Sequence, residues 1–225
     1  LEDAHVEVVT DLLTSFFVRR NLTGYPQTYA LAKIFMTLIE ALKNARGEAV
    51  VAIVAERLRE ASASDEEFRS RLMGRIYEEN TDITRFILAT LAEDAMTKET
   101  RVDLWRQEKN RFVWTIEHIL PQGENLPAAW TEMLGGADVA HKVQEEYKHR
   151  LGNLTITAYN SNLGNKSFLE KRDRQDSKGR YIGYRNGLSL NAELVTRASW
   201  VSDDIERRTH ELASKVMARF PLPAS

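Results

Sequence analysis

The chain has 225 residues, of which 43% are hydrophobic and 28% are charged, enough to bury a core and keep a solvated surface. Its net charge of −2 provides no overall basic field, so any binding of nucleic acid has to depend on a local patch of cations. The absence of cysteine excludes disulfides, thiolate nucleophiles and cysteine-ligated zinc, and it suits the reducing cytoplasm, where we expect the protein to reside. No apolar run is long enough to predict a membrane span.

Residues 1–108 are predicted to be helical throughout, and we assign them to a helical bundle or linker domain. Ser64 and Glu67 form a capping-box pattern at the start of one helix, and Thr81 or Asp82 could cap the next. The apolar stripes of this half are typical of a buried bundle core, with a partner surface as the alternative. They recur at helical spacing in VEVVTDLLTSFFVRR, TYALAKIFMTLIEALKN and AVVAIVAERLREA.

Residues 109–225 differ from the first half in their residue pattern, and we assign them to a second domain. RFVWTI (111–116) and LTIT (154–157) have the β-branched and aromatic composition of strands. The expected fold is therefore mainly α with a small embedded β-β-α unit, an α+β arrangement. Its predicted helices cover ADVAHKVQEEYKHRL, then NSNLGNKSFLEKRDRQ as one helix, and a last helix from Ser202 or Asp203 to Pro221.

The first of these strands ends in an acid beside a histidine, Glu117-His118, in the string TIEHILPQ. Adjacent strand residues point to opposite faces, so the two side chains can serve one target only if the backbone twists at the strand end. A histidine with a pKa near ~6.5 is suited to take a proton from water at neutral pH. Carboxylate and amide oxygens are ligands that Mg²⁺ prefers. Amides follow the second strand in an asparagine-rich stretch, Asn160, Asn162 and Asn165.

The string IEHILPQ…W…HRLGNLTITAYNSNLGNKSFLEK resembles the His-Me finger, or HNH, nucleases. Within them it is most similar to the C-terminal nuclease domain of the GmrSD-type modification-dependent restriction enzymes and their relatives in phage defence. The resemblance implies a β-β-α metal finger in which Glu117 binds Mg²⁺ or Mn²⁺ and His118 is the general base. It further implies that Asn153 orients the histidine ring through backbone or side-chain hydrogen bonds. Asn160 is favoured as the further metal ligand, with Asn162 close behind.

A basic stretch follows this constellation directly, and we expect it to bind DNA phosphates without reading sequence. Between residues 166 and 185 seven cations face three acids, which leaves +4 in a chain of −2 overall. A solvated charged helix is the alternative reading of such a run. The predicted nucleic-acid contacts are Asn165, Lys166, Lys171, Arg172, Arg174 and Lys178. His149, just ahead of the second strand, is expected to lie at a solvated helix end.

These features predict a Mg²⁺-dependent endonuclease that acts on double-stranded DNA in the restriction of foreign or phage DNA. One active site cuts one strand, so a double-strand break would need a homodimer or two successive events. The resemblance also implies an upstream nucleotide-dependent sensor domain, and the opening LEDAHVEVV without methionine leads us to expect a fragment. The alternatives are a catalytically inactive helical module that binds DNA or a protein, and an HNH nuclease that cleaves RNA. Activity is expected to rise through roughly pH 6 to 7 if His118 keeps its ordinary pKa.

Overall fold

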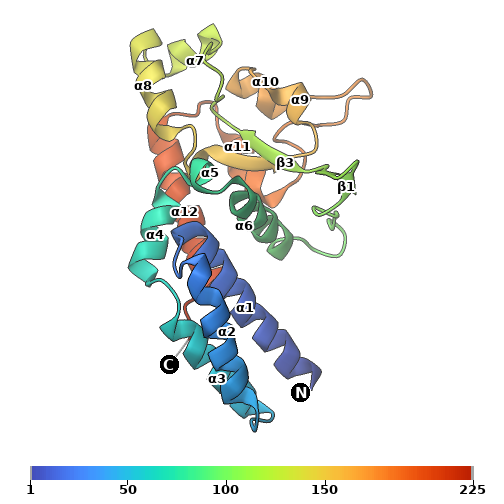
Figure 1. Cartoon of the computed structure of the whole chain (residues 1–225). Coiled ribbons are helices and arrows are strands. Elements are labelled where there is room, and N and C mark those ends of the chain that lie inside the picture. The colour runs from blue at the N-terminus through green and yellow to red at the C-terminus, as the bar shows by residue number, and fades with distance from the viewer. Residues whose placement is uncertain (1, 224–225) are drawn as a thin grey trace. The chain divides into compact units, whose positions relative to one another are not determined.

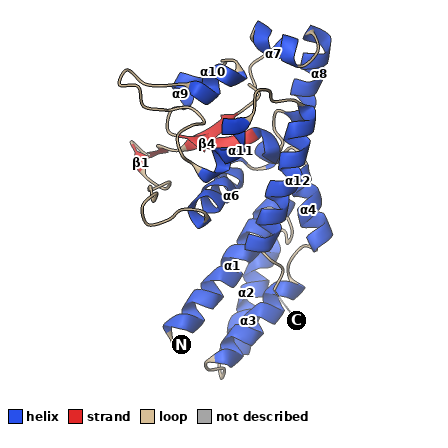
Figure 2. Cartoon of the chain, turned by 180° about the vertical axis from the view of Figure 1, so that it is seen from behind, coloured by secondary structure: helices blue, strands red, loops and turns tan. Residues whose placement is uncertain are grey.

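A computed structural model describes residues 2–223, and it consists mainly of helices with two small antiparallel strand pairs (Figures 1 and 2). The chain divides into two compact units. One contains the chain up to Leu72 together with the segment that follows Ala213, and the other is Met73–Ala213. No helix in the described residues combines the length and the apolar character that a membrane crossing requires.

The first unit is a helical bundle, in line with the apolar stripes of the sequence. Its core contains Phe16, Leu38, Val54 and Leu58, contributed by three helices, of which α3 packs against both others. At the end of α1, Gly24 adopts a left-handed φ of 73° and donates its backbone N–H to Arg20, which closes the helix. The helices are α1 (Asp3–Thr23), α2 (Thr28–Leu42), α3 (Glu48–Glu60), α4 (Asp65–Met73) and the end of α12 (Ser202–Arg219).

The second unit surrounds a two-stranded antiparallel sheet made by β3 (Thr115–His118) and β4 (Leu154–Thr157). The register pairs Glu117 with Thr155 and His118 with Leu154. The remaining elements are α5 (Ile76–Glu79), α6 (Thr81–Asp94), β1 (Gln107–Glu108), β2 (Arg111–Phe112), α7 (Ala128–Met133), α8 (Ala137–Tyr147), η1 (Leu151–Asn153), α9 (Asn160–Leu163), α10 (Phe168–Asp173), η2 (Ser189–Asn191), α11 (Ala192–Thr196) and the start of α12.

Several predicted elements are confirmed, and others are corrected. LTIT forms β4 as predicted, but the first strand starts only at Thr115, because Arg111–Phe112 pairs with Gln107–Glu108 in a separate hairpin. Asn80, rather than Thr81 or Asp82, caps α6 by accepting the Ile83 N–H at 3.1 Å. The single helix predicted from residue 160 is two short helices, α9 and α10, because the chain turns at Gly164 with a φ of 39°. Ser167, with Glu170 in a capping box, then begins α10 anew.

A hydrophobic core holds the end of β3 in place. Ile119 and Leu120, the two residues after His118, are fully buried in it. Three aromatic side chains from distant segments line this core, Trp130, Phe168 and Trp200, and the Phe168 and Trp200 rings stack with centroids 5.9 Å apart. The strand end that carries Glu117 and His118 therefore rests on packed side chains rather than on a loose loop.

Candidate active site

The last two side chains of strand β3 contact different neighbours. Glu117 and His118 are 2% and 6% exposed, so both are buried in spite of their polarity. Glu117 meets Lys171 of α10, whereas His118 meets Tyr77 and His149. Both nevertheless reach one pocket of about 210 Å³. The pocket is lined by Ile116, Glu117, His118, Pro121, Gln122, Gly123, Asn160, Gly164 and Asn165.

Glu117 forms a buried ion pair. Its Oε1 accepts a hydrogen bond from Lys171 Nζ at 2.7 Å and lies 3.5 Å from the Tyr184 hydroxyl, while Oε2 has no hydrogen-bond partner within residues 2–223. Burial raises the pKa of Glu117, and the nearby Lys171 ammonium opposes this rise. Burial likewise lowers the pKa of Lys171, opposed by Glu117. One carboxylate oxygen is thus anchored, and the other remains available beside the pocket.

Lys171 is a correction to the predicted nucleic-acid contacts. Its side chain is 1% exposed, and besides Glu117 its ammonium donates to the backbone carbonyl of His118 at 2.7 Å and lies 3.3 Å from that of Ile119. These three oxygens satisfy its donors inside the protein, so the ammonium does not reach a phosphate at the surface. Its observed contacts instead orient Glu117 and the backbone at the strand end.

His118 lies in an aromatic and imidazole environment. Its Nε2 lies 3.2 Å from Nδ1 of His149, and the Tyr77 ring approaches its edge with centroids 4.6 Å apart. Burial, the neighbouring His149 and the nearby lysines lower the pKa of His118 to about 3. The ring is therefore neutral at physiological pH, which is the form that a base requires. The expected activity rise through pH 6 to 7 depended on an unperturbed pKa, and this environment moves it to lower pH.

His149 is the residue that the sequence reasoning missed. It was expected at a solvated helix end, and this is wrong, because the side chain is buried between Tyr77, His118 and Glu78. The signal available in the sequence was its place in HRLGN, immediately ahead of the second strand, which puts it beside the end of the first.

Asn153 holds the backbone after His118 rather than the imidazole itself. Its side-chain Oδ1 accepts the Leu120 N–H at 2.8 Å, its Nδ2 donates to the Leu120 carbonyl at 2.9 Å and to the Lys148 carbonyl at 3.0 Å. Its own carbonyl accepts the Ile119 N–H at 2.9 Å. The side chain is fully buried, so these contacts form a rigid bridge between the two strands. Any influence on the histidine ring passes through this backbone.

The structure brings two of the three predicted asparagines to the pocket. Asn160 donates through Nδ2 to the Ile116 carbonyl at 2.7 Å and to Thr115 Oγ1 at 3.2 Å, which leaves its Oδ1 as an acceptor. Asn165 also lines the pocket, with its Nδ2 donating to the Asn125 carbonyl at 2.6 Å. Asn162 lies exposed on α9 and outside the lining. Of the two predicted metal-binding asparagines, Asn160 is therefore the one that lines the pocket with Glu117 and His118.

The basic stretch is partly neutralised by its own acids. Arg172 pairs with Asp173 at 2.6 Å and donates to the Arg197 carbonyl, so its guanidinium is engaged at both sides. Lys166, Arg174 and Lys178 have no ion pair in the described part of the chain. Arg180 and Arg185 are paired with Asp176 and Asp173, respectively.

The donors around the pocket fit a hard divalent cation. The described residues contain no cluster of three or more His, Cys, Asp or Glu side chains that could hold a metal ion. Mg²⁺, however, is often bound through one or two carboxylates and keeps several waters. Glu117 Oε2 and Asn160 Oδ1, neither of which has a hydrogen-bond partner in the described residues, provide one carboxylate and one amide oxygen of this kind.

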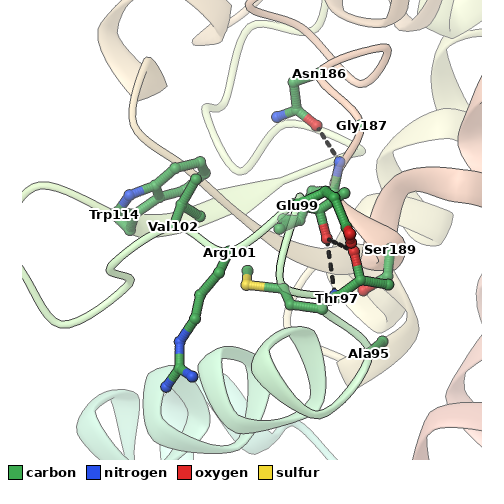
Figure 3. A pocket seen from close by; sticks show the side chains of 12 residues that line it. Ala95, Thr97, Glu99, Arg101, Val102, Trp114, Asn186, Gly187 and Ser189 are labelled. Carbon is green, nitrogen blue, oxygen red and sulfur yellow. Dashed lines mark hydrogen bonds between the residues drawn. The ribbon is translucent and has the colours of Figure 1, made fainter.

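A larger cavity of about 470 Å³ in the same unit has a different lining (Figure 3). No histidine occurs among the described residues that line it. Its carboxylate, Glu99, is exposed, and a hydrogen bond with the Thr97 side chain lowers the pKa, which keeps it ionised. Figure 3 shows Trp114 and Val102 together at one side, away from Asn186 and Gly187. The smaller pocket is therefore the candidate active site on chemical grounds rather than on size.

Residues 62–215, more than half of the chain, match the model of the C-terminal domain of the GmrSD restriction endonucleases. The chain belongs to this family. This confirms the resemblance carried by IEHILPQ and HRLGNLTIT, and the GmrSD match spans the pocket and all the side chains described around it. No curated protein and no solved structure gives a significant match.

Proposed function

We propose that this GmrSD C-terminal domain is a Mg²⁺- or Mn²⁺-dependent endonuclease that hydrolyses phosphodiester bonds of double-stranded DNA during restriction of foreign DNA. The observation that supports this most directly is the convergence of Glu117, His118 and Asn160 on one pocket in a chain of a restriction endonuclease family. An upstream nucleotide-dependent sensor domain and a homodimer for double-strand cleavage are part of the same proposal.

In this proposal His118 takes the proton from the attacking water. Its Nε2 is engaged by His149, so Nδ1 is the nitrogen left for the water. Within the described residues, the buried side-chain atoms without a partner are guanidinium nitrogens, so Nδ1 is not sealed in the interior. A positioned base of this kind contributes about 10²- to 10⁴-fold to the rate.

Glu117 and Asn160 would hold the cation through Oε2 and Oδ1, while Lys171 keeps Oε1 of Glu117 fixed. The bound cation supplies Lewis-acid stabilisation of the charged phosphate and of the departing 3′-oxygen. Lys166, Arg174 and Lys178 contact flanking phosphates and do not read the bases.

Incubation of supercoiled plasmid with Mg²⁺ or Mn²⁺ tests the proposal. The wild type is expected to relax or linearise the plasmid, and His118→Ala to lose about 100-fold or more of this rate. His141→Ala is the matched control, because His141 is an exposed histidine of α8 outside the pocket. Equal cleavage by wild type and His118→Ala contradicts the assignment of the base.

Two further measurements separate the proposal from its alternatives. Labelled RNA in place of plasmid distinguishes an RNA-cleaving enzyme, which would cut RNA and spare DNA. Titration with Mn²⁺, followed by electron paramagnetic resonance, tests metal binding without turnover, and Glu117→Gln is expected to weaken it at least about tenfold. A wild type that binds DNA but neither cleaves nucleic acid nor binds Mn²⁺ is the inactive binding module.

A further inference from the structure

A row of three polar side chains leads from the protein surface to the pocket. Glu78 of α5 is half-exposed, and its Oε1 lies 3.4 Å from Nε2 of His149. Nδ1 of His149 lies in turn 3.2 Å from Nε2 of His118. His149 thus lies between a carboxylate at ion-pair distance from its Nε2 and the proposed base at hydrogen-bond distance from its Nδ1.

The chemistry of these groups favours one position for the hydrogen on each imidazole ring. An ionised carboxylate can only accept, so its approach to Nε2 favours the neutral His149 ring that carries its hydrogen on Nε2 and a lone pair on Nδ1. That lone pair accepts from His118, so the hydrogen of a neutral His118 ring lies on Nε2. Nδ1 of His118 is then the lone pair, and this is the nitrogen left for the pocket.

Neighbouring side chains keep Glu78 ionised and restrict the orientation of the two imidazole rings. Arg75 holds Glu78 ionised through contacts with both carboxylate oxygens, 2.7 Å to Oε1 and 2.6 Å to Oε2. The Tyr77 ring stacks on His149 with an interplanar angle of 9° and meets His118 edge-on at 78°. The Tyr77 backbone N–H also donates to the His149 carbonyl at 3.3 Å. Rotation of either imidazole is thereby restricted.

We propose that Glu78 and His149 are positioning residues that hold His118 in its Nε2-protonated tautomer and leave Nδ1 for the attacking water. The inference rests on the proposed function of His118 as the general base. Without Glu78, either nitrogen of His149 could carry the hydrogen, and without His149 nothing described in the structure would select the tautomer of His118. The pair acts on the base and does not contact the scissile phosphate.

Nitrogen chemical shifts of histidine rings in ¹⁵N-labelled protein, measured near neutral pH without metal, report the tautomer directly. In wild type, His118 is expected to show a protonated Nε2 and an unprotonated Nδ1. His149→Phe, which keeps a ring beside Tyr77 but has no acceptor, is expected to shift this tautomer. His149→Asn, which retains an acceptor oxygen near the position of Nδ1, is expected to restore it. His141→Phe, at an exposed site of α8, is the matched control.

Cleavage kinetics provide the second readout. His149→Phe is expected to lower kcat at least about tenfold with KM nearly unchanged, because only the base is disturbed. Glu78→Leu is expected to act in the same direction, while Glu78→Gln keeps an acceptor for His149 Nε2–H and retains activity. If His149→Phe does not fold, the half-exposed Glu78 pair of variants gives the same comparison.

The inference is overturned if wild-type His118 carries its hydrogen on Nδ1. It is equally overturned if His149→Phe and Glu78→Leu both fold and leave the tautomer and kcat as in wild type. If the wild type cleaves no nucleic acid, the proposed function fails, but the nitrogen shifts still decide whether Glu78 and His149 set the tautomer. The two failures are therefore distinguishable.

Discussion

Replacement of Gly152 by alanine is expected to destabilise the unit that carries the active site. A Cβ at this position would lie 2.0 Å from the Ile205 carbonyl oxygen, 2.5 Å from Thr209 Oγ1 and 2.6 Å from Thr209 N. Real Cβ contacts stay beyond 3.0 Å, so η1 and α12 would have to separate by at least 1 Å, the difference between 3.0 and 2.0. The obstacle is backbone, which cannot rotate aside as a flexible side chain could.

The magnitude follows from two contributions. Overpacking costs about 1–3 kcal/mol. The separation would also weaken two hydrogen bonds, from Gly152 N–H to Thr209 Oγ1 at 3.0 Å and from Arg208 Nη1 to the Gly152 carbonyl at 2.6 Å. Each contributes about 1 kcal/mol or more. The expected loss is therefore about 3–5 kcal/mol, or a fall in Tm of roughly 6–20 °C for a domain of this size.

Urea unfolding followed by circular dichroism and by tryptophan fluorescence measures this loss, since Trp130 and Trp200 are buried in the same unit. Gly123→Ala is the matched control, because nothing lies within 4 Å of its added Cβ. If Gly152→Ala unfolds within about 0.5 kcal/mol of the wild type, the range of an ordinary surface substitution, the steric reasoning is refuted.

Three further outcomes are expected. Lys171→Met removes one partner of a buried ion pair and should lower the free energy of unfolding in urea by about 3–5 kcal/mol. Adding Glu117→Gln should recover part of this loss. No recovery would mean that the lysine acts through packing alone. Burial lowers the folded-state pKa of His118 to about 3, so the unfolded chain binds more protons than the folded chain between pH 6.5 and 3. The free energy of unfolding should therefore fall as the pH decreases through this window, and it should fall less steeply in His118→Gln. Arg208→Met should destabilise by several kcal/mol, because its buried guanidinium donates to the carbonyls of Gly152, Leu154 and Leu190; an unchanged unfolding midpoint would argue against this clamp.

Sequence patterns alone determined much of the framework. Apolar spacing predicted the helices of the first half, since periodicity reports which face of an element is buried. The β-branched run LTIT predicted β4, and the motif around Glu117-His118 predicted the family. These features succeed because each depends on residues that are neighbours in the chain.

Only the tertiary structure decided which side chains meet. Lys171 and His149 are 54 and 31 residues from the groups that they contact at the end of β3, and no local pattern states that one is buried against Glu117 and the other against His118. A charge run and a histidine beside a helix end are usually solvated, which is why both were misjudged. The fold instead packs α10 and the segment ahead of β4 against the end of β3, which buries both side chains. A polar group removed from water must then find its partners inside the protein. Asn160 rather than Asn162 lines the pocket because the two residues are two positions apart on the same short helix, α9, so their side chains point to different sides of it.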